Sequence, residues 1–243
     1  MDRPPELPAP SPAEVRQRWR ITFAREPVPV EQVGRAGVVA WQAALQSSGL
    51  SVAGLEPGGT GRARISIAAP LPAPFAGEAE LADLFLLERR LAWQVREALE
   101  TRLPPGHHWV AAEDVWIGAP PLPGRVVAAD WRAELAGAEP AGAPPDGTRL
   151  ADGVRSLLAA RELPRVRAKG GGEKRYDLRP LLIDLSVAGP AVIRFRTRIH
   201  PELGSGRPEE VVAALVDASG LELEAAAMTR TGLVLAEDVA TGA

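Results

Sequence analysis

The chain of 243 residues is 46% hydrophobic and 24% charged with a formal net charge of −3, a composition typical of globular proteins. It contains no cysteine, which excludes disulfides, thiolate nucleophiles and cysteine-held zinc or iron–sulfur sites from it. No apolar run approaches the roughly 20 residues that cross a bilayer, and prolines and charges stand where a signal peptide needs apolar residues. We therefore expect a cytoplasmic protein with no membrane partner.

The cations are 26 arginines and two lysines, and asparagine is absent. A GC-rich coding sequence or growth at high temperature would each produce this bias. Arginine abundance is thus no indication of nucleic-acid binding, and only clusters of cations are informative.

The first half of the chain begins with a proline-rich segment, residues 1–13, for which we expect a flexible tail. Alternating and helical spacings of apolar residues then predict a series of elements. In chain order these are a strand at 18–24, a helix at 30–46, strands at 50–55, 62–68 and 81–87, a helix at 91–103 and a strand at 109–117.

The second half gives the same order of elements. It has a strand at 125–135, a helix at 150–158, a hairpin of strands 163–169 and 174–178, a strand at 191–199, a helix from Pro208 and a closing strand within 221–235. This order predicts an α+β fold of two tandem ferredoxin-like units, each an antiparallel sheet with two helices packed on one face. The predicted domains are residues 14–120 and 121–243.

The predicted hairpin carries the densest positive charge of the sequence. Its first strand alternates Arg165, Arg167 and Lys169, three glycines follow, and Lys174, Arg175 and Arg179 return on the other strand. Only Glu173 and Asp177 oppose them. A concentrated positive field on an acidic protein favours an anionic partner.

A second row of cations alternates along the strand at 191–199. Arg194, Arg196 and Arg198 share one face, and Ile193, Phe195, Thr197 and Ile199 share the other. Cross-strand pairing with carboxylates would neutralise this row. If the strand instead neighbours the one at 165–169, both rows form one cationic sheet face suited to a phosphate backbone. With Tyr176 the only tyrosine, phosphate contact is favoured over base stacking.

The remaining motifs are weaker. Gly170–Gly172 opens no helix and does not form a Walker loop. Arg207 precedes the helix at Pro208 and is a secondary anion contact, although the carboxylates of Glu209 and Glu210 already compensate the positive end of the helix dipole. Adjacent His107 and His108 point to opposite faces of a strand, so no metal site is expected. Asp177 is a weak catalytic candidate that more commonly forms a salt bridge.

The segments Arg165–Lys169, Tyr176–Pro180 and Gly206–Val211 resemble an uncharacterised bacterial family known as radical S-adenosylmethionine-linked proteins. Looser likeness extends over 64–72, 78–80 and 112–116. The family is encoded beside, or fused to, a cobalamin-type radical S-adenosylmethionine protein, so the resemblance implies such a partner. Where the family usually has Ser-His-Leu-Asp and Gly-Phe-x-Pro-x-Pro-Lys stretches, this chain reads Glu31–Gly34 and Glu56–Arg64.

Three hypotheses follow. The first is a non-catalytic accessory module of a radical S-adenosylmethionine enzyme that binds RNA, or an RNA-containing particle, through the cationic residues of its second half. The second is an adaptor whose cationic patch docks on the partner enzyme itself. The third is an RNA-modifying enzyme that uses Asp177, an idea based on architecture alone. We expect no cofactor held by this chain, since the absence of cysteine leaves the radical cluster to the partner.

Overall fold

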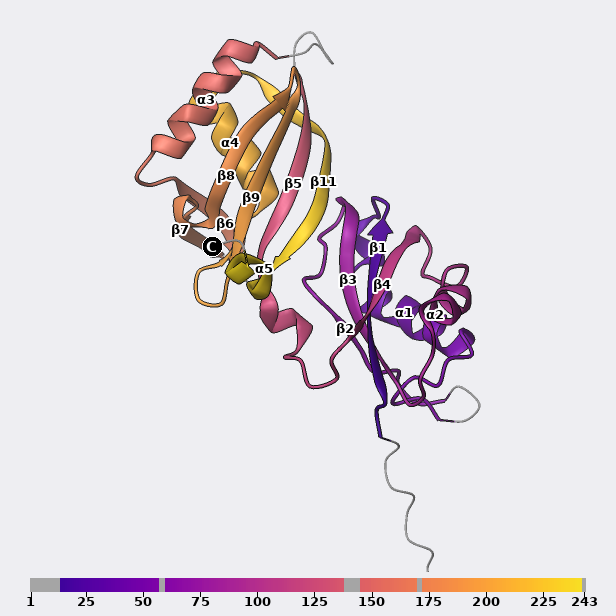
Figure 1. Ribbon diagram of the computed structural model, residues 1–243. Helices are drawn as coiled ribbons and strands as arrows, with labels where there is room; N and C mark the ends of the chain where they lie inside the picture. The colour runs from indigo at the N-terminus through magenta and orange to yellow at the C-terminus, as the bar shows by residue number, and fades with distance from the viewer. Residues whose placement is uncertain (1–13, 57–59, 138–144, 170–171, 242–243) are drawn as a thin grey trace, which may run out of the picture.

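The computed structural model describes residues 14–56, 60–137, 145–169 and 172–241 (Figure 1). It has the mixed α+β architecture that the sequence predicts, with helices packed on a largely antiparallel sheet. The predicted tail at 1–13 lies outside the described residues. Among the described residues, no helix has the length and apolar character needed to span a bilayer.

The elements of the first half are β1 (Gln17–Arg25), η1 (Val30–Gln32), α1 (Arg35–Ser47), β2 (Ile65–Ile67), β3 (Ala76–Leu86), α2 (Ala92–Leu99) and β4 (His107–Val115). Strand β1 lies between β4 and β3, and β2 pairs with β3, all antiparallel. Trp19, Ile21 and Phe23 alternate toward the helices and form a buried cluster with Trp41 and Leu45 of α1. The helices α1 and α2 lie beside these strands in Figure 1.

The elements of the second half are η2 (Leu122–Arg125), β5 (Val126–Gly137), α3 (Gly147–Ala159), β6 (Pro164–Lys169), β7 (Gly172–Asp177), η3 (Arg179–Leu181), β8 (Leu182–Gly189), β9 (Val192–His200), β10 (Gly204–Ser205), α4 (Pro208–Ser219), β11 (Leu223–Leu235) and α5 (Ala236–Thr241). Strand β5 lies between β9 and β11, and β8 pairs with β9, again all antiparallel. Trp131 and Phe195 form part of the buried cluster under α3 and α4.

The two halves share one nine-stranded sheet, whereas the sequence predicted two separate sheets. The junction is a short parallel ladder in which Thr229 and Arg230 of β11 pair with Ala76 and Gly77 of β3. In Figure 1 β11 lies at the side of its half that faces β3. Because β2 occupies the rest of that edge of β3, only the first residues of β3 are free to pair with β11.

The predicted hairpin forms, but it does not enter the main sheet. Strands β6 and β7 pair only with each other, with Arg167 opposite Lys174. The neighbours of β9 are instead β5, β8 and β10. The condition for one shared cationic sheet face, that the strands at 165–169 and 191–199 are neighbours, is therefore not met.

Other elements also differ from prediction. The segment 50–55 makes only isolated bridges, such as Val52 with Leu86 at the end of β3. The helix expected from residue 30 begins at Arg35, after the single turn η1. The strand β8 was not predicted at all. The helix expected at Pro208 begins there, with Arg207 as its N-cap.

Candidate anion-binding site

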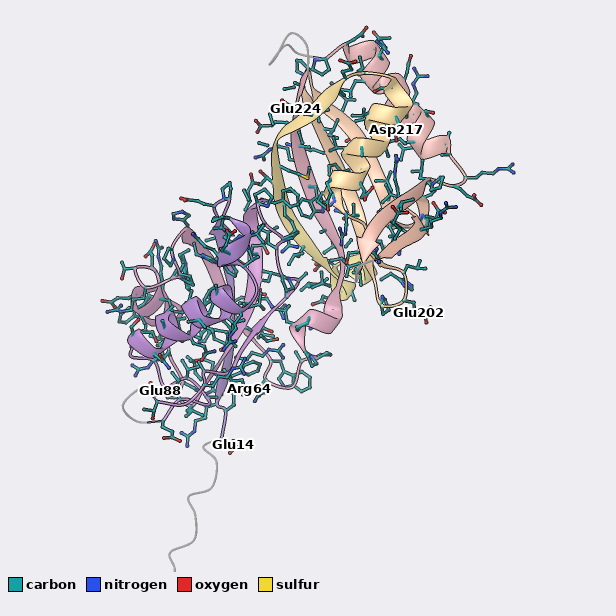
Figure 2. All side chains as sticks on the ribbon, turned by 180° about the vertical axis from the view of Figure 1, so that it is seen from behind. Glu14, Arg64, Glu88, Glu202, Asp217 and Glu224 are labelled. Atoms are coloured by element: carbon teal, nitrogen blue, oxygen red, sulfur yellow. The ribbon has the colours of Figure 1, made fainter. Side chains whose placement is uncertain are left out.

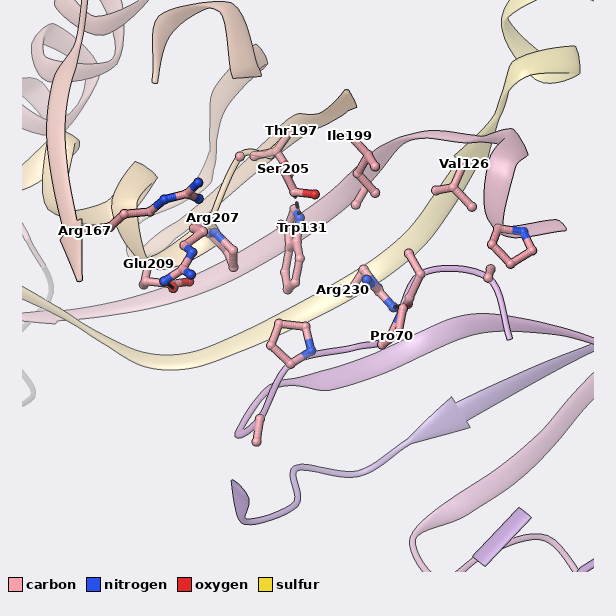
Figure 3. A pocket seen from close by; sticks show the side chains of 18 residues that line it. Pro70, Val126, Trp131, Arg167, Thr197, Ile199, Ser205, Arg207, Glu209 and Arg230 are labelled. Atoms are coloured by element: carbon pink, nitrogen blue, oxygen red, sulfur yellow. Dashed lines mark hydrogen bonds and ion pairs between the residues drawn. The ribbon is translucent and has the colours of Figure 1, made fainter. Parts of the chain in front are cut away.

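A cavity of about 710 Å³ lies between the two halves, on the side of the sheet that carries Trp131 (Figure 3). Its walls come from the loop at 68–73, strands β5, β9 and β11, β6 of the hairpin, and the start of α4. Three arginines and one carboxylate line it: Arg167, Arg207, Arg230 and Glu209. The cavity therefore brings together cations from elements that are distant in the sequence.

Arg167 and Arg207 lie close together at one end of the cavity in Figure 3. Arg207 has only a loose ion pair, 3.8 Å from its Nη1 to Glu209 Oε1. The Nε of Arg167 is buried and has no hydrogen-bond partner among the described residues. Guanidinium groups gathered with donors unused form an arrangement that a phosphate or carboxylate completes through charge-assisted hydrogen bonds.

Tyr176 supports the Arg167 side chain from the partner strand of the hairpin. The Arg167 guanidinium lies over its ring, 5.2 Å from the centroid. Burial raises the pKa of the Tyr176 hydroxyl, and Glu210 raises it further against the opposing effect of Arg167 and Arg207. The hydroxyl thus stays protonated at neutral pH, and within the described chain it has no hydrogen-bond partner.

The floor of the cavity is neutral and fixed. The Trp131 indole N–H donates to Thr197 Oγ1 at 3.1 Å, which holds both side chains in place. At the other end of the cavity, beside Pro70 in Figure 3, Arg230 pairs with the buried Glu80 and donates to the Ala69 carbonyl. Arg230 is therefore a paired structural cation, whereas Arg167 and Arg207 remain available to a ligand.

Two predicted contacts of the hairpin have structural roles instead. Arg165 donates to Asp217 of α4 at 2.6 Å and ties the hairpin to that helix. Arg179 donates to the carbonyl oxygens of Leu158, Ala160 and Leu182, all between 2.8 and 3.1 Å. The guanidinium of Arg179 already donates to backbone carbonyl oxygens from Nε, Nη1 and Nη2. The surroundings of Arg179 therefore do not support the prediction that it contacts phosphate.

The other hairpin cations are only partly described. Arg175 is exposed, opposite Val166 in the ladder. Lys169 and Lys174 pair through their backbones with Gly172 and Arg167. The side chains of these two lysines lie outside what the structure describes.

The row on β9 lies on the opposite face of the sheet from the cavity. Arg194, Arg196 and Arg198 are exposed, while Phe195 and Thr197 are buried toward α4 and the cavity, so the predicted alternation is confirmed. A bidentate pair with Asp130, at 2.6 and 2.9 Å, neutralises Arg196, raising the pKa of its guanidinium. Of the two alternatives for this row, Arg196 therefore follows the one in which a cross-strand carboxylate neutralises it, and the two rows of cations do not form one face.

Asp177 lies outside the cavity lining. Its Oδ1 accepts hydrogen bonds from the backbone N–H groups of Leu163 at 2.7 Å and Arg179 at 2.9 Å. These bonds close the base of the hairpin. Within the described ranges, no group of three or more histidine, aspartate or glutamate side chains is placed to hold a metal ion.

Sequence reasoning missed Trp131, Arg230 and the loop at 68–73. Trp131 is buried, with 4% of its surface exposed, and it also forms the cavity floor. Arg230 stands alone between threonines and shows no cluster in the sequence. The proline-rich run Pro70–Pro74 is the one visible signal, since prolines commonly mark a loop that packs against other elements.

Comparisons with known proteins identify a family but no function. A family model described as an uncharacterized protein conserved in bacteria (DUF2344) matches residues 42–211. No curated protein matches the sequence. Among solved structures, the chain is similar to one in the crystal structure of a Cbf5–Nop10–Gar1 complex, with a TM-score of 0.46 and 10% identity. A second, in the archaeal box H/ACA sRNP Nop10–Cbf5 complex, has a TM-score of 0.40 and 11% identity. Each alignment covers 88% of this chain and 48% of the other, so the chain spans about half the length of these structures.

Proposed function

The chain belongs to DUF2344, a family of uncharacterized proteins conserved in bacteria, and we propose its function from the site. In this proposal the protein is a non-catalytic module that binds RNA through the RNA phosphates. The observation that carries the proposal is the meeting of Arg167 and Arg207 at one end of the cavity, with the Nε of Arg167 unused. Phosphate groups are the anions that paired guanidinium groups bind best in fork geometry.

The phosphate-binding residues of this module are Arg167 and Arg207, and the exposed Arg175, on the other face of the hairpin, adds to the positive field. Arg194 and Arg198 lie on the far face and contribute only to the general field around the protein. With Tyr176 covered by Arg167 and Trp131 buried, the site offers no open platform for stacked bases. Binding is therefore electrostatic and tolerant of sequence.

The partner in this proposal is a radical S-adenosylmethionine protein, to which the module presents its RNA. The support is the resemblance of Arg165–Lys169 and Gly206–Val211 to proteins encoded beside such enzymes. A chain without cysteine leaves the thiolate-held cluster of that chemistry to the partner. The alternative is an adaptor in which Arg167 and Arg207 dock on an acidic surface of the partner enzyme.

Two ferredoxin-like domains, 14–120 and 121–243, carry this function in our proposal. Two strand orders support it, β4-β1-β3-β2 in the first half and β11-β5-β9-β8 in the second. In each half the four strands and two helices follow the same chain order, with the hairpin β6–β7 inserted between α3 and β8 in the second. The insertion supplies Arg167 to the cavity.

The test compares two double variants that change charge equally on opposite faces. Arg167→Glu/Arg207→Glu alters the cavity, and Arg194→Glu/Arg198→Glu is the matched control. Fluorescence anisotropy with a labelled 20-nucleotide RNA of mixed sequence is measured from about 50 to 300 mM salt. Loss of two phosphate contacts lowers the salt slope by about 1.4, at about 0.7 per single-strand contact, in the cavity variant only.

Equal losses in both double variants would contradict the assignment, since that result indicates a diffuse field without a site. Absence of RNA binding by the wild type at low salt would reject the RNA-binding function. The adaptor would then predict that the purified partner enzyme is retained by the wild type after nuclease treatment and released by Arg167→Glu/Arg207→Glu.

A further inference from the structure

A second cavity, of about 510 Å³, lies within the first half between α1 and the strands. Its volume is within the range of sites that enclose small organic ligands. Most of its wall is apolar, formed by aromatic side chains and by prolines from two loops, including Pro70 and Pro104. Such a wall binds apolar rings by excluding water from both surfaces.

Three rings form one side of this cavity. Phe23 and His107 are stacked with centroids 5.3 Å apart, and Trp41 meets both edge-on, at 5.1 and 5.7 Å. Trp41 and Phe23 are almost fully buried, so their positions are fixed by packing. A preformed aromatic corner of this kind favours a flat ring that can stack or meet the three rings edge-on.

His107 offers a hydrogen-bond acceptor to this space. Its Nδ1 lies 3.0 Å from the Pro105 carbonyl oxygen, which assigns the ring proton to Nδ1 and leaves Nε2 with a free lone pair. Burial and the nearby Arg25 lower the pKa of the His107 imidazole, so the ring is neutral at neutral pH. A ligand with an N–H or O–H group can therefore donate to Nε2.

The polar wall of the cavity has an excess of positive charge. Arg25 and Glu80 both line it, and Glu80 is already paired with Arg230 in two hydrogen bonds. Two guanidinium groups thus share one carboxylate, and all three side chains are less than a tenth exposed. Burial lowers the pKa of Arg25, the sign of a cation that is poorly compensated in this environment.

Arg25 is held in place without being neutralised. Its terminal nitrogens donate to the carbonyl oxygens of Leu71, Pro72 and Phe75 at 2.9 to 3.1 Å, and its Nε has no partner among the described residues. Carbonyl oxygens satisfy donors but carry no full charge. A single anionic group entering the cavity would supply the missing charge.

We propose that this cavity binds a small aromatic molecule with one anionic group, such as an aromatic carboxylate or sulfonate. The ring occupies the corner formed by Phe23, Trp41 and His107. The anion lies toward Arg25, where the wall has one positive charge in excess. The two cavities share Pro70 in their walls, but Phe23, Trp41, His107 and Arg25 do not line the RNA-binding cavity, and the proposal does not depend on that function.

The experiment uses 8-anilinonaphthalene-1-sulfonate as the probe, with fluorescence titration of the full chain. Gly37 of α1 lines the cavity, and a Cβ there would meet only the Gln32 carbonyl at an ordinary 3.5 Å. Gly37→Leu therefore adds a side chain at the cavity wall with an ordinary contact at its Cβ, and leucine is the better helix former. Ala43→Leu, on the exposed surface of α1, is the matched control.

We expect the wild type and Ala43→Leu to bind one probe with equal affinity, and Gly37→Leu to bind at least about tenfold more weakly. Thermal unfolding of each variant checks that the fold is retained. The neutral analogue N-phenyl-1-naphthylamine should bind several-fold more weakly than the sulfonate. NMR shifts on probe addition should be centred on Gly34 and His107.

Equal probe affinity of Gly37→Leu and wild type would overturn the proposal, as would failure of the wild type to bind the probe. Equal affinity for the neutral and anionic probes would overturn the role of Arg25. Because neither variant lies in the RNA-binding cavity, RNA affinity should be unchanged in Gly37→Leu. A loss of RNA affinity in Gly37→Leu would mean that binding in one cavity is coupled to the other.

Discussion

Arg25 and Arg179 each bind three backbone carbonyl oxygens, but Arg25 lies in the wall of the second cavity and keeps its Nε unpaired among the described residues, whereas Arg179 uses Nε, Nη1 and Nη2 on carbonyl oxygens and lines neither cavity. Arg167 and Arg207 look no different in the sequence, yet they remain open to a ligand. The sequence predicted the cluster of cations correctly as a set of residues. It could not separate structural arginines from binding ones, because the carbonyl partners of Arg179 come from two other segments of the chain.

The same limit applies to the faces of β9. Alternation predicted that Arg194 and Arg196 share a face, and the structure confirms it. Neutralisation of Arg196 by Asp130 depends on the register of β9 with β5, where these two residues are directly opposite. Register is set by tertiary packing, so a single strand's pattern does not contain it.

His107 makes stability depend on pH. Its pKa is lowered by burial in the folded protein, below the value of about 6.5 in the unfolded chain. The unfolded chain therefore binds more protons as pH falls, so the stabilising contribution is present in full above pH 6.5 and is lost toward lower pH. The melting temperature of wild type should fall more between pH 7.5 and 5.5 than that of His107→Gln. A variant with the wild-type pH dependence would contradict this assignment.

At the scale of elements, prediction succeeded where the pattern is local. The hairpin β6–β7 was predicted from alternating cations around a glycine turn, and the two strands form an antiparallel pair. Strand β8 was not predicted because its buried residues, Leu182 and Leu185, are three positions apart, whereas a half-buried strand has a period of two. Its position is instead fixed by pairing with β9.

The hairpin is a separate small sheet, so its attachment depends on a few contacts. Asp177 accepts two backbone hydrogen bonds at its base, and Arg165 joins it to α4 through Asp217. Since Arg167 reaches the cavity from this hairpin, the attachment also positions the candidate site.

We predict that Asp177→Ala destabilises the protein by about 1–2 kcal/mol, because two backbone donors lose their acceptor. Chemical denaturation measures the loss, and limited proteolysis should show faster cleavage near the hairpin. The control is Asp152→Ala, which removes an exposed ion pair with Arg155 on α3 and should cost less than about 0.5 kcal/mol. Equal stabilities of the two variants would show that Asp177 does not fasten the hairpin.

At the scale of the molecule, the two halves meet through a short ladder and a buried ion pair. Arg230 and Glu80 are 2% and 3% exposed, and Arg230 also lies 5.8 Å from the Trp131 ring centroid. Nothing in the sequence pairs these residues, since 150 positions separate them. The junction and both cavities were therefore beyond sequence prediction, because segments from distant parts of the chain compose them.

We predict that Glu80→Gln lowers the free energy of unfolding more than Arg230→Met does. Glu80→Gln leaves Arg25 and Arg230 buried without a counter-charge, whereas Arg230→Met leaves Glu80 with Arg25 nearby. Breaking a buried pair costs about 3–5 kcal/mol, and Glu80→Gln should lie at the upper end. Urea denaturation of both variants measures the difference. If Arg230→Met were the less stable protein, Arg25 would not share the carboxylate.

The distance between Glu80 and Arg230 along the chain also sets an order of events during synthesis. At about 5–20 residues per second, roughly 8–30 seconds pass on the ribosome between the addition of one residue and of the other. Throughout that interval the first residues of β3 lack their β11 neighbour, and the Glu80 carboxylate has only Arg25 to oppose it. The nascent first half thus carries an open strand end, a surface that can pair with other chains until β11 emerges.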